Sequence, residues 1–366
     1  MMRACGTLTA GGVVVAFVVS VSVLAGPIIP PAGPVAPTPG PEPRVAINLT
    51  NTPGDADSLF RITQPGSYYL TGNVAGVAGK HGIEVAATRV TIDLMGFELV
   101  GNGAASAFDG ITYVGSADGS FTVLNGCIRN WGDDGVRGAG CVVRNCVLAS
   151  NADQGVSGAI AVSDTVASGN TGGGIQANAG AVVRNCQARD NGGRGIDASN
   201  GSTILDCVAR NNGSYGILAF GNAVISRCTS TLNTLSGING QQATSIFDCN
   251  SSDNDENGIT TQGQCHVRGN TCHGNGEAGI FVSALTGTIV EGNNCTNNVR
   301  GYNITGTNCL VVRNTASGNT TWNWDIDGNN VVGPIIDRTA VANGSINGNS
   351  APDSTGSTNP NANITY

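Results

Sequence analysis

The sequence has little charge and few of the residues that favour helices. Asp, Glu, Lys and Arg make up 11% of its 366 residues, Lys80 is the only lysine, and aromatic residues make up 5%. In their place the chain carries 55 glycines and 40 asparagines, which exclude a long coiled coil and argue against a helical bundle. A formal net charge of −8 argues against a general nucleic-acid binder, which would need a basic surface. Since 40% of the residues are hydrophobic, the chain can still bury a core.

The first 44 residues differ in composition from the rest. Arg3 precedes an apolar run at 13–24 and small residues at 25–26, which is the pattern of a signal peptide comprising residues 1–25. The run is too short to span a membrane comfortably, so we expect no membrane span after cleavage and a secreted or cell-surface protein. Residues 26–44 contain eight of the 13 prolines, which predicts an extended linker.

The dipeptide Gly-Ile or Gly-Val recurs through the central part of the chain. Its glycines are Gly82, Gly110, Gly135, Gly155, Gly174, Gly195, Gly216, Gly237, Gly258 and Gly279. The last six copies are spaced by 21 residues, and an Asn stands four positions before each of the last seven. Four cysteines keep the same 21-residue spacing, namely Cys186, Cys207, Cys228 and Cys249. Repeats of this length indicate a solenoid in which each copy is one structural unit.

Each repeat holds three short runs of β-forming residues, separated by Asn, Gly, Asp and Ser. Three strands and three turns describe one coil of a parallel β-helix, with equivalent residues stacked ~4.8 Å apart. Leucine is too sparse for a leucine-rich repeat. We therefore predict an all-β, right-handed parallel β-helix of about ten coils over residues 82–320. An N-terminal cap and first coil are expected at 45–81, a C-terminal cap at 321–342 and a polar tail at 343–366.

The Gly-Ile start, the Val-x-Asn-Cys strand at Val183–Cys186 and the Asn turn resemble the right-handed parallel β-helix repeat proteins of the pectin-lyase-like superfamily. The resemblance covers roughly residues 80–320. It implies the fold and, for the enzymes of the superfamily, a substrate that lies along the outer face of the strand beginning at Gly-Ile. It does not decide the activity, because the superfamily includes lyases, hydrolases, epimerases, phage tailspikes and adhesins.

The candidate catalytic residues are acidic turn residues. Asp133 and Asp134 precede Gly135, and Asp153 lies one coil later. Paired carboxylates are what acid–base catalysis needs, and Arg137 would hold the substrate. Equivalent turns elsewhere carry Gln154 or Arg194, however, which favours a role as ordinary turn residues.

The sequence thus predicts a non-catalytic exported scaffold that contacts a polysaccharide or a cell-envelope glycan. A polysaccharide lyase or glycoside hydrolase is the alternative. An acidic face would repel uronic-acid polymers, which favours a neutral glycan. We expect no cofactor and no metal site, with Ca²⁺ at Asp253–Glu256 as the alternative. The stacked cysteines are expected to be buried thiols, with disulfides as the alternative.

Overall fold

A computed structural model describes residues 44–103, 107–115, 120–283, 285–337, 339 and 359–366. The expected signal peptide, the expected linker up to residue 43, and residues 343–358 of the expected tail lie outside them. Every regular element of the described residues is a β-strand. None of these residues forms a helix of the length and apolarity that a membrane crossing needs.

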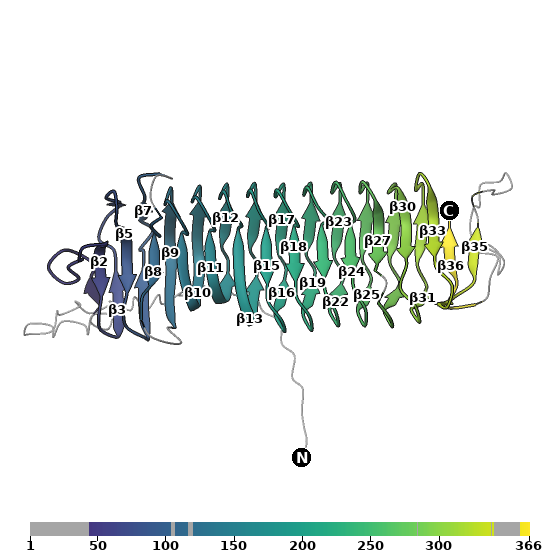
Figure 1. Cartoon of the computed structure of the whole chain (residues 1–366), viewed down its shortest axis with the longest axis horizontal. Coiled ribbons are helices and arrows are strands. Elements are labelled where there is room, and N and C mark those ends of the chain that lie inside the picture. The colour runs from purple at the N-terminus through teal and green to yellow at the C-terminus, as the bar shows by residue number, and fades with distance from the viewer. Residues whose placement is uncertain (1–43, 104–106, 116–119, 284, 338, 340–358) are drawn as a thin grey trace, which may run out of the picture. The chain divides into compact units, whose positions relative to one another are not determined.

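The strands stack into three parallel ladders, and each coil adds one rung to each ladder (Figure 1). The first ladder contains the strands that begin near Gly-Ile: β2 (Ser58–Ile62), β5 (His81–Val85), β8 (Ile111–Tyr113), β10 (Val136–Ala149), β11 (Val156–Ser163), β13 (Ile175–Arg184), β15 (Ile196–Ala198), β18 (Ile217–Ala219), β21 (Ile238–Gly240), β24 (Ile259–Thr261), β27 (Ala278–Val282), β30 (Arg300–Ile304) and β33 (Trp322–Ile326).

The second ladder also runs through the longer strands β10, β11 and β13. Its other members are β1 (Val45–Ala46), β3 (Gly66–Tyr69), β6 (Val90–Asp93), β9 (Phe121–Arg129), β16 (Thr203–Leu205), β19 (Val224–Ser226), β22 (Ser245–Phe247), β25 (His266–Arg268), β28 (Ile289–Glu291), β31 (Leu310–Val312) and β34 (Val331–Val332).

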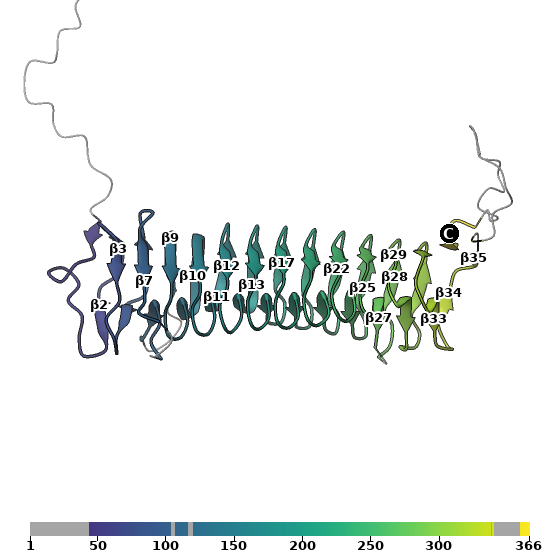
Figure 2. The same ribbon diagram turned by 90° about the horizontal axis from the view of Figure 1, so that it is seen from above.

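The third ladder includes the later parts of β9 and β10. Its other members are β4 (Val74–Ala75), β7 (Glu98–Val100), β12 (Val166–Ser168), β14 (Gln187–Arg189), β17 (Val208–Arg210), β20 (Thr229–Thr231), β23 (Asn250–Ser252), β26 (Thr271–His273), β29 (Asn294–Thr296), β32 (Thr315–Ser317) and β36 (Asn363–Thr365). Strand β35 (Ile335–Asp337) pairs with β36. Figure 2 shows the coils following one another in chain order.

This arrangement confirms the predicted parallel β-solenoid, and the first ladder has about 13 coils against the ten or so expected. The additional coils lie at the two ends, where aromatic residues take the place of Ile. Phe60 pairs with Ile83, Tyr302 with Ile280, and Trp324 with Tyr302. The Gly-Ile signature is therefore lost in coils that keep the fold.

One column of the core consists of β-branched side chains from the second ladder, and it packs with buried side chains of the first and third ladders. Its members have no exposed surface and pair in register: Val143, Val162, Val183, Ile204, Ile225, Ile246, Val267 and Val290. Because each coil covers the apolar edge of the previous one, the stack is stabilised cooperatively.

The asparagines four residues before the Gly-Ile glycines form a continuous buried ladder. After Asn151, the side-chain oxygen of each one accepts hydrogen bonds from the backbone N–H and the Nδ2 of the Asn one coil earlier, whereas the Asn151 oxygen accepts from the Trp131 N–H. From Asn151 to Asn319 the Nδ2···Oδ1 distances are 2.8–3.1 Å. The same Nδ2 groups also donate to a backbone carbonyl of the preceding coil, as Asn212 does to Ala188.

The cysteine column has a structural explanation. Each thiol donates to the carbonyl two residues earlier, as Cys186 does to Arg184 at 3.1 Å. Thr165, which occupies the same column, makes the equivalent bond to Ser163 with its hydroxyl. All 11 cysteines of the described residues are free thiols. From Asn270 onward the column changes to asparagine and forms a second amide ladder.

The end of the chain differs from the expected cap and tail. Residues 322–332, assigned to a cap, form β33 and β34 and continue the first and second ladders. Residues 363–365, assigned to the polar tail, form β36 and extend the third ladder on β32. Asn363 continues the second amide ladder, because its side-chain oxygen accepts from the backbone N–H and Nδ2 of Asn314.

Candidate functional site

A column of polar side chains stands directly before the glycines that open the first-ladder strands at the N-terminal part of the stack. Its members are His81, Asp109, Asp134 and Gln154. The first three each accept the backbone N–H of the next member, at 2.9, 3.0 and 2.9 Å. One oxygen of Asp109 and one of Asp134 therefore each form a hydrogen bond to the backbone of the next coil.

The same column brings three carboxylates together. Asp109, Asp133 and Asp134 each place an oxygen within 4.8 Å of the other two. Asp109 and Asp134 are 2% and 3% exposed, and the side chain of Asp133 is 24% exposed. We call these residues the carboxylate cluster. It lies at the start of the first-ladder strands β8 and β10.

Burial dominates the electrostatics of this cluster. Burial raises the pKa of Asp134 to about 7. The hydrogen bond from the Gln154 N–H lowers this pKa, and the charges of Asp109, Asp133 and Asp153 raise it further. Burial also raises the pKa of Asp109, although Thr112, the Asp134 N–H and His81 act in the opposite direction. A carboxyl group with a pKa near neutrality can hold or release a proton at physiological pH.

The four residues expected from the sequence have different surroundings. Asp133 and Asp134 belong to the cluster. Arg137 forms an ion pair with Asp133, with 3.1 Å between Nη1 and Oδ2. Asp153 is exposed and lies outside the group of three. Partial loss of solvent around its carboxyl group, followed by the charge of Asp133, raises its pKa. The sequence signal that identifies Asp109 is its register, because it precedes the Gly of Gly110-Ile111 as Asp134 precedes Gly135.

A second acidic group, Asp55, Asp57 and Glu84, also has oxygens within 4.8 Å of one another. Here Arg61 lies against Asp55 and within 3.5 Å of Glu84. Hydrogen bonds from Ser58 and Arg61 hold the pKa of Asp55 well below its usual range, whereas burial raises that of Glu84. Arg61 thus contacts two of the three carboxylates of this group, whereas in the carboxylate cluster Arg137 pairs with Asp133 alone.

A hard cation such as Ca²⁺ takes carboxylate oxygens, so the carboxylate cluster is the better candidate for one. The alternative at Asp253–Glu256 loses a ligand. Asn254 belongs to the buried asparagine ladder, and its side-chain oxygen accepts from the backbone N–H and the Nδ2 of Asn233.

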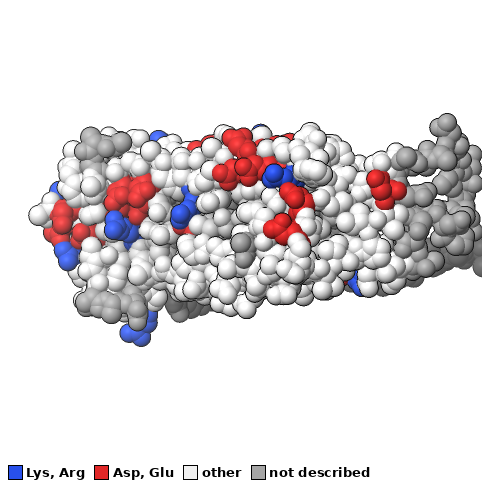
Figure 3. Space-filling model, turned by 45° about the vertical axis from the view of Figure 1, so that its right-hand side comes forward, with Lys and Arg blue, Asp and Glu red and all other residues white. Residues whose placement is uncertain are grey.

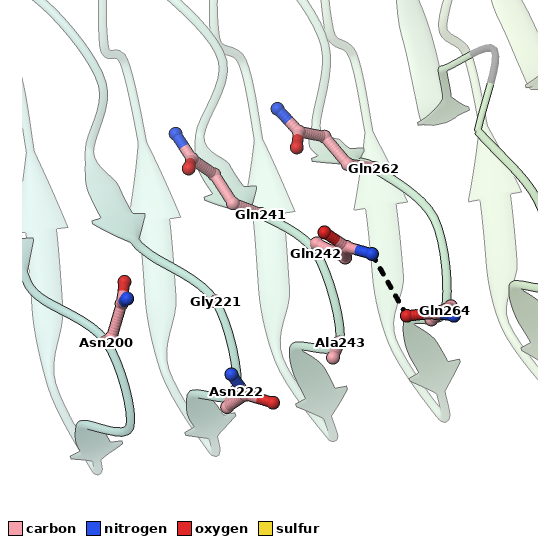
Figure 4. A pocket seen from close by; sticks show the side chains of 8 residues that line it. All are labelled: Asn200, Gly221, Asn222, Gln241, Gln242, Ala243, Gln262 and Gln264. Atoms are coloured by element: carbon pink, nitrogen blue, oxygen red, sulfur yellow. Dashed lines mark hydrogen bonds between the residues drawn. The ribbon is translucent and has the colours of Figure 1, made fainter.

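The other end of the first-ladder strands carries two open hollows. One, of about 570 Å³, is lined by Ser120, Ala139, Gly140, Ile160, Asn178, Ala179 and Ser199. The other, of about 450 Å³, is lined by Asn200, Gly221, Asn222, Gln241, Gln242, Ala243, Gln262 and Gln264 (Figure 4). The two adjoin at Ser199 and Asn200, which are neighbours in the chain. We call them together the turn groove, because they follow the turns that lead from the first ladder to the second.

The charged side chains of the molecule gather elsewhere. On the face drawn in Figure 3, acidic and basic side chains form patches with wide uncharged surface between them. None of the residues lining the turn groove is charged. The molecule therefore presents two chemically distinct candidate surfaces, one acidic and one uncharged.

Comparison with known proteins agrees with this fold. The sequence model of a family described as "Right handed beta helix region" matches residues 108–244 and 178–321, which together exceed half of the chain. No curated protein matches the sequence. Among solved structures, the chain is similar to the A-module of mannuronan C-5 epimerase AlgE6 from Azotobacter vinelandii, with 18% identity, a TM-score of 0.54 and coverage of 82% of this chain and 90% of that chain. It is also similar to the AlgE4 A-module of the same organism, with 17% identity, a TM-score of 0.49 and coverage of 73% and 84%. At these identities the likeness concerns the fold alone.

Proposed function

The chain belongs to the right-handed β-helix family, and on that premise we propose that it is an exported scaffold that holds a glycan along its coils without altering it chemically. The observation that carries this proposal is the turn groove, which runs across consecutive coils at the end of the first-ladder strands opposite the carboxylate cluster. Export rests on the signal peptide expected at residues 1–25.

A stack of equivalent coils suits a polymeric partner. Each coil offers the same turn ~4.8 Å from the next, so a chain of similar sugar units meets similar side chains at every step. A polymer that makes many weak contacts in this way gains affinity with length. The AlgE6 mannuronan epimerase module, which is similar in fold, is named for a polysaccharide.

The carboxylates are largely occupied by structural contacts. Asp109 and Asp134 are almost fully buried, and each uses one oxygen to accept a backbone N–H of the next coil. Asp133 is held by Arg137. These contacts favour a structural role for the cluster over a catalytic one.

A glycoside hydrolase is the second candidate, and the raised pKa of Asp134 favours it. A carboxyl group with a pKa of about 7 can donate a proton to the glycosidic oxygen as the bond to the leaving sugar breaks. With its oxygen within 4.8 Å of Asp134, Asp133 would act as the nucleophile and form a covalent bond to the sugar carbon as the leaving sugar departs. Water would then break that bond, with Asp134 taking the proton of the water and Asp133 released as a carboxylate.

One experiment separates the two candidates. The mature protein is incubated with neutral and uronic polysaccharides, and the reducing ends, unsaturated products and retardation in affinity gels are measured. We expect retardation by at least one polysaccharide without product. Product that is abolished in Asp134→Asn and kept in Asp153→Asn would establish the hydrolase instead. Neither retardation nor product with any polysaccharide would refute both candidates.

A further inference from the structure

We infer that the turn groove binds a linear, uncharged glycan that lies parallel to the axis of the stack. This inference rests on the proposed glycan-binding role and adds the class of glycan and the residues that hold it. It is independent of whether the carboxylate cluster is catalytic.

The turn groove has no charged side chain along its length. Seven successive segments that join the first ladder to the second, of which the first three lie within β10, β11 and β13, contain no Asp, Glu, Lys or Arg. They are residues 138–141, 158–161, 178–181, 199–202, 220–223, 241–244 and 262–265. The turns after the second and third ladders do carry charge, for example Asp206, Arg227 and Asp253. A uronic or sulfated polymer needs basic side chains or a bridging cation, and these turns supply neither.

Several side-chain amides that line the groove are available for hydrogen bonds to a ligand. Four of the lining amides, Asn200, Asn222, Gln241 and Gln262, make no side-chain hydrogen bond to any described residue. Gln241 and Gln262 come from consecutive coils and point the same way (Figure 4). Each amide offers two donor hydrogens and an acceptor oxygen, which matches sugar hydroxyls that both donate and accept.

A fixed amide pair supports this surface. Gln242 donates from Nε2 to Oε1 of Gln264 at 3.0 Å, across one coil (Figure 4). Because this pair holds two of the lining side chains in place, part of the groove is ordered before a ligand arrives. Such pre-organisation lowers the entropy cost of binding.

Apolar side chains lie in and beside the groove, namely Ile160 in its lining and Phe220 directly before the lining residue Gly221. Phe220 is half-buried and stands between Ser199 and Gln241 in the column of residues that directly follow the first-ladder strands. Ile160, in the adjoining hollow, is 42% exposed. The C–H faces of sugar rings pack against aromatic and aliphatic side chains of this kind, whereas the ring edges meet the amides.

The distance between coils is close to the length of one sugar ring in an extended chain. The hollows of about 570 and 450 Å³ are aligned across successive coils. In an extended β-1,4-linked hexose chain one ring advances by a distance close to the interstrand spacing of ~4.8 Å. One ring can therefore face one coil over several coils, which a branched or tightly coiled polymer could not do.

The test measures calorimetric binding of cellohexaose, mannohexaose and laminarihexaose, with hexagalacturonate as the charged probe. We expect at least one neutral hexasaccharide to bind and hexagalacturonate not to bind. Gln241→Ala combined with Gln262→Ala should weaken binding about tenfold, and Phe220→Ala should do the same. The matched control is Gln187→Ala, an exposed Gln on β14 outside the groove, which should change affinity less than about twofold.

Each outcome has a defined meaning once thermal denaturation has shown that the variants fold. Binding that is unaffected by the groove variants overturns the inference. Preferential binding of hexagalacturonate overturns it as well, but leaves the proposed glycan-binding scaffold standing. Absence of binding to every polysaccharide in the wider screen refutes both. Binding that persists in Asp133→Asn separates the groove from the carboxylate cluster.

Discussion

Each position of the buried ladder requires asparagine, because only a side chain of this length carries both the acceptor and the donor that the neighbouring coils need. Asn212, which is 1% exposed, accepts from the backbone and the side chain of Asn191 and donates to Asn233 and to the Ala188 carbonyl. Asp lacks the donor and Gln is longer by one methylene. A single residue type meets these requirements, so Asn recurs at this position in consecutive coils from Asn151 to Asn319, and its spacing can be seen in the sequence.

Replacement of Asn212 should be costly. Asn212→Ala removes the oxygen that accepts from the Asn191 N–H and Nδ2, and the Nδ2 that donates to the Asn233 oxygen and the Ala188 carbonyl. We expect a loss of about 2–4 kcal/mol in the free energy of unfolding. Denaturant unfolding measures the loss. Asn250→Ala, on an exposed position of β23, is the control and should change stability little. An unaltered midpoint for Asn212→Ala would contradict the role of the ladder.

At the scale of the element, the turn before each first-ladder strand determines what the carboxylates do. The sequence places Asp133 and Asp134 side by side, and the Gly-Ile register aligns Asp109 with Asp134. It does not give their burial, which depends on neighbouring coils of irregular length, with glycine spacings of 28 and 25 residues. The acidic residues of the cluster could thus be found from the sequence, whereas the raised pKa of Asp134 could not.

The pKa of Asp134 leads to a prediction about pH. Because the folded-state pKa is raised from 3.8 to about 7, the folded protein holds this proton more tightly than the unfolded chain. Its stabilising effect is complete below about pH 4, decreases between pH 4 and 7, and is lost above pH 7, with an upper bound of ~4 kcal/mol. Asp134→Asn keeps an acceptor for the Gln154 N–H and should flatten this part of the profile.

Thermal denaturation of both proteins between pH 4.5 and 8.5 tests this expectation. The control variant is Asp248→Asn, which neutralises an exposed carboxylate on another turn. It should leave the pH dependence close to that of the wild type. Identical profiles for Asp134→Asn and the wild type would show that Asp134 does not hold its proton up to neutral pH.

At the scale of the whole stack, its length and its end were harder to predict than its interior. The outer coils replace Ile by Phe60, Tyr302 and Trp324, so they share the fold without the repeat signature. Strand β36 joins β32 although Asn363 is 49 residues beyond Asn314 in the chain. No periodic pattern can predict a contact that follows so long an interruption.

The last eight residues should accordingly stabilise the coil beneath them. Deletion of residues 359–366 removes the acceptor for the Asn314 N–H and amide and the Thr365 hydroxyl that accepts from Trp324 Nε1. We expect a lower melting temperature and faster proteolysis near β32, and Asn363→Ala should reproduce most of the effect. Unchanged melting in both variants would show that β36 contributes nothing to the stack.

The amide ladders also give the stack a direction. In every pair the earlier asparagine donates and the later one accepts, from Asn151 to Asn319. A growing edge therefore always presents donors that only the following coil can satisfy. A chain that emerges amino-terminus first, from a ribosome or an export channel, can lay down its turns in the order of synthesis, and each finished turn serves as the template for the next.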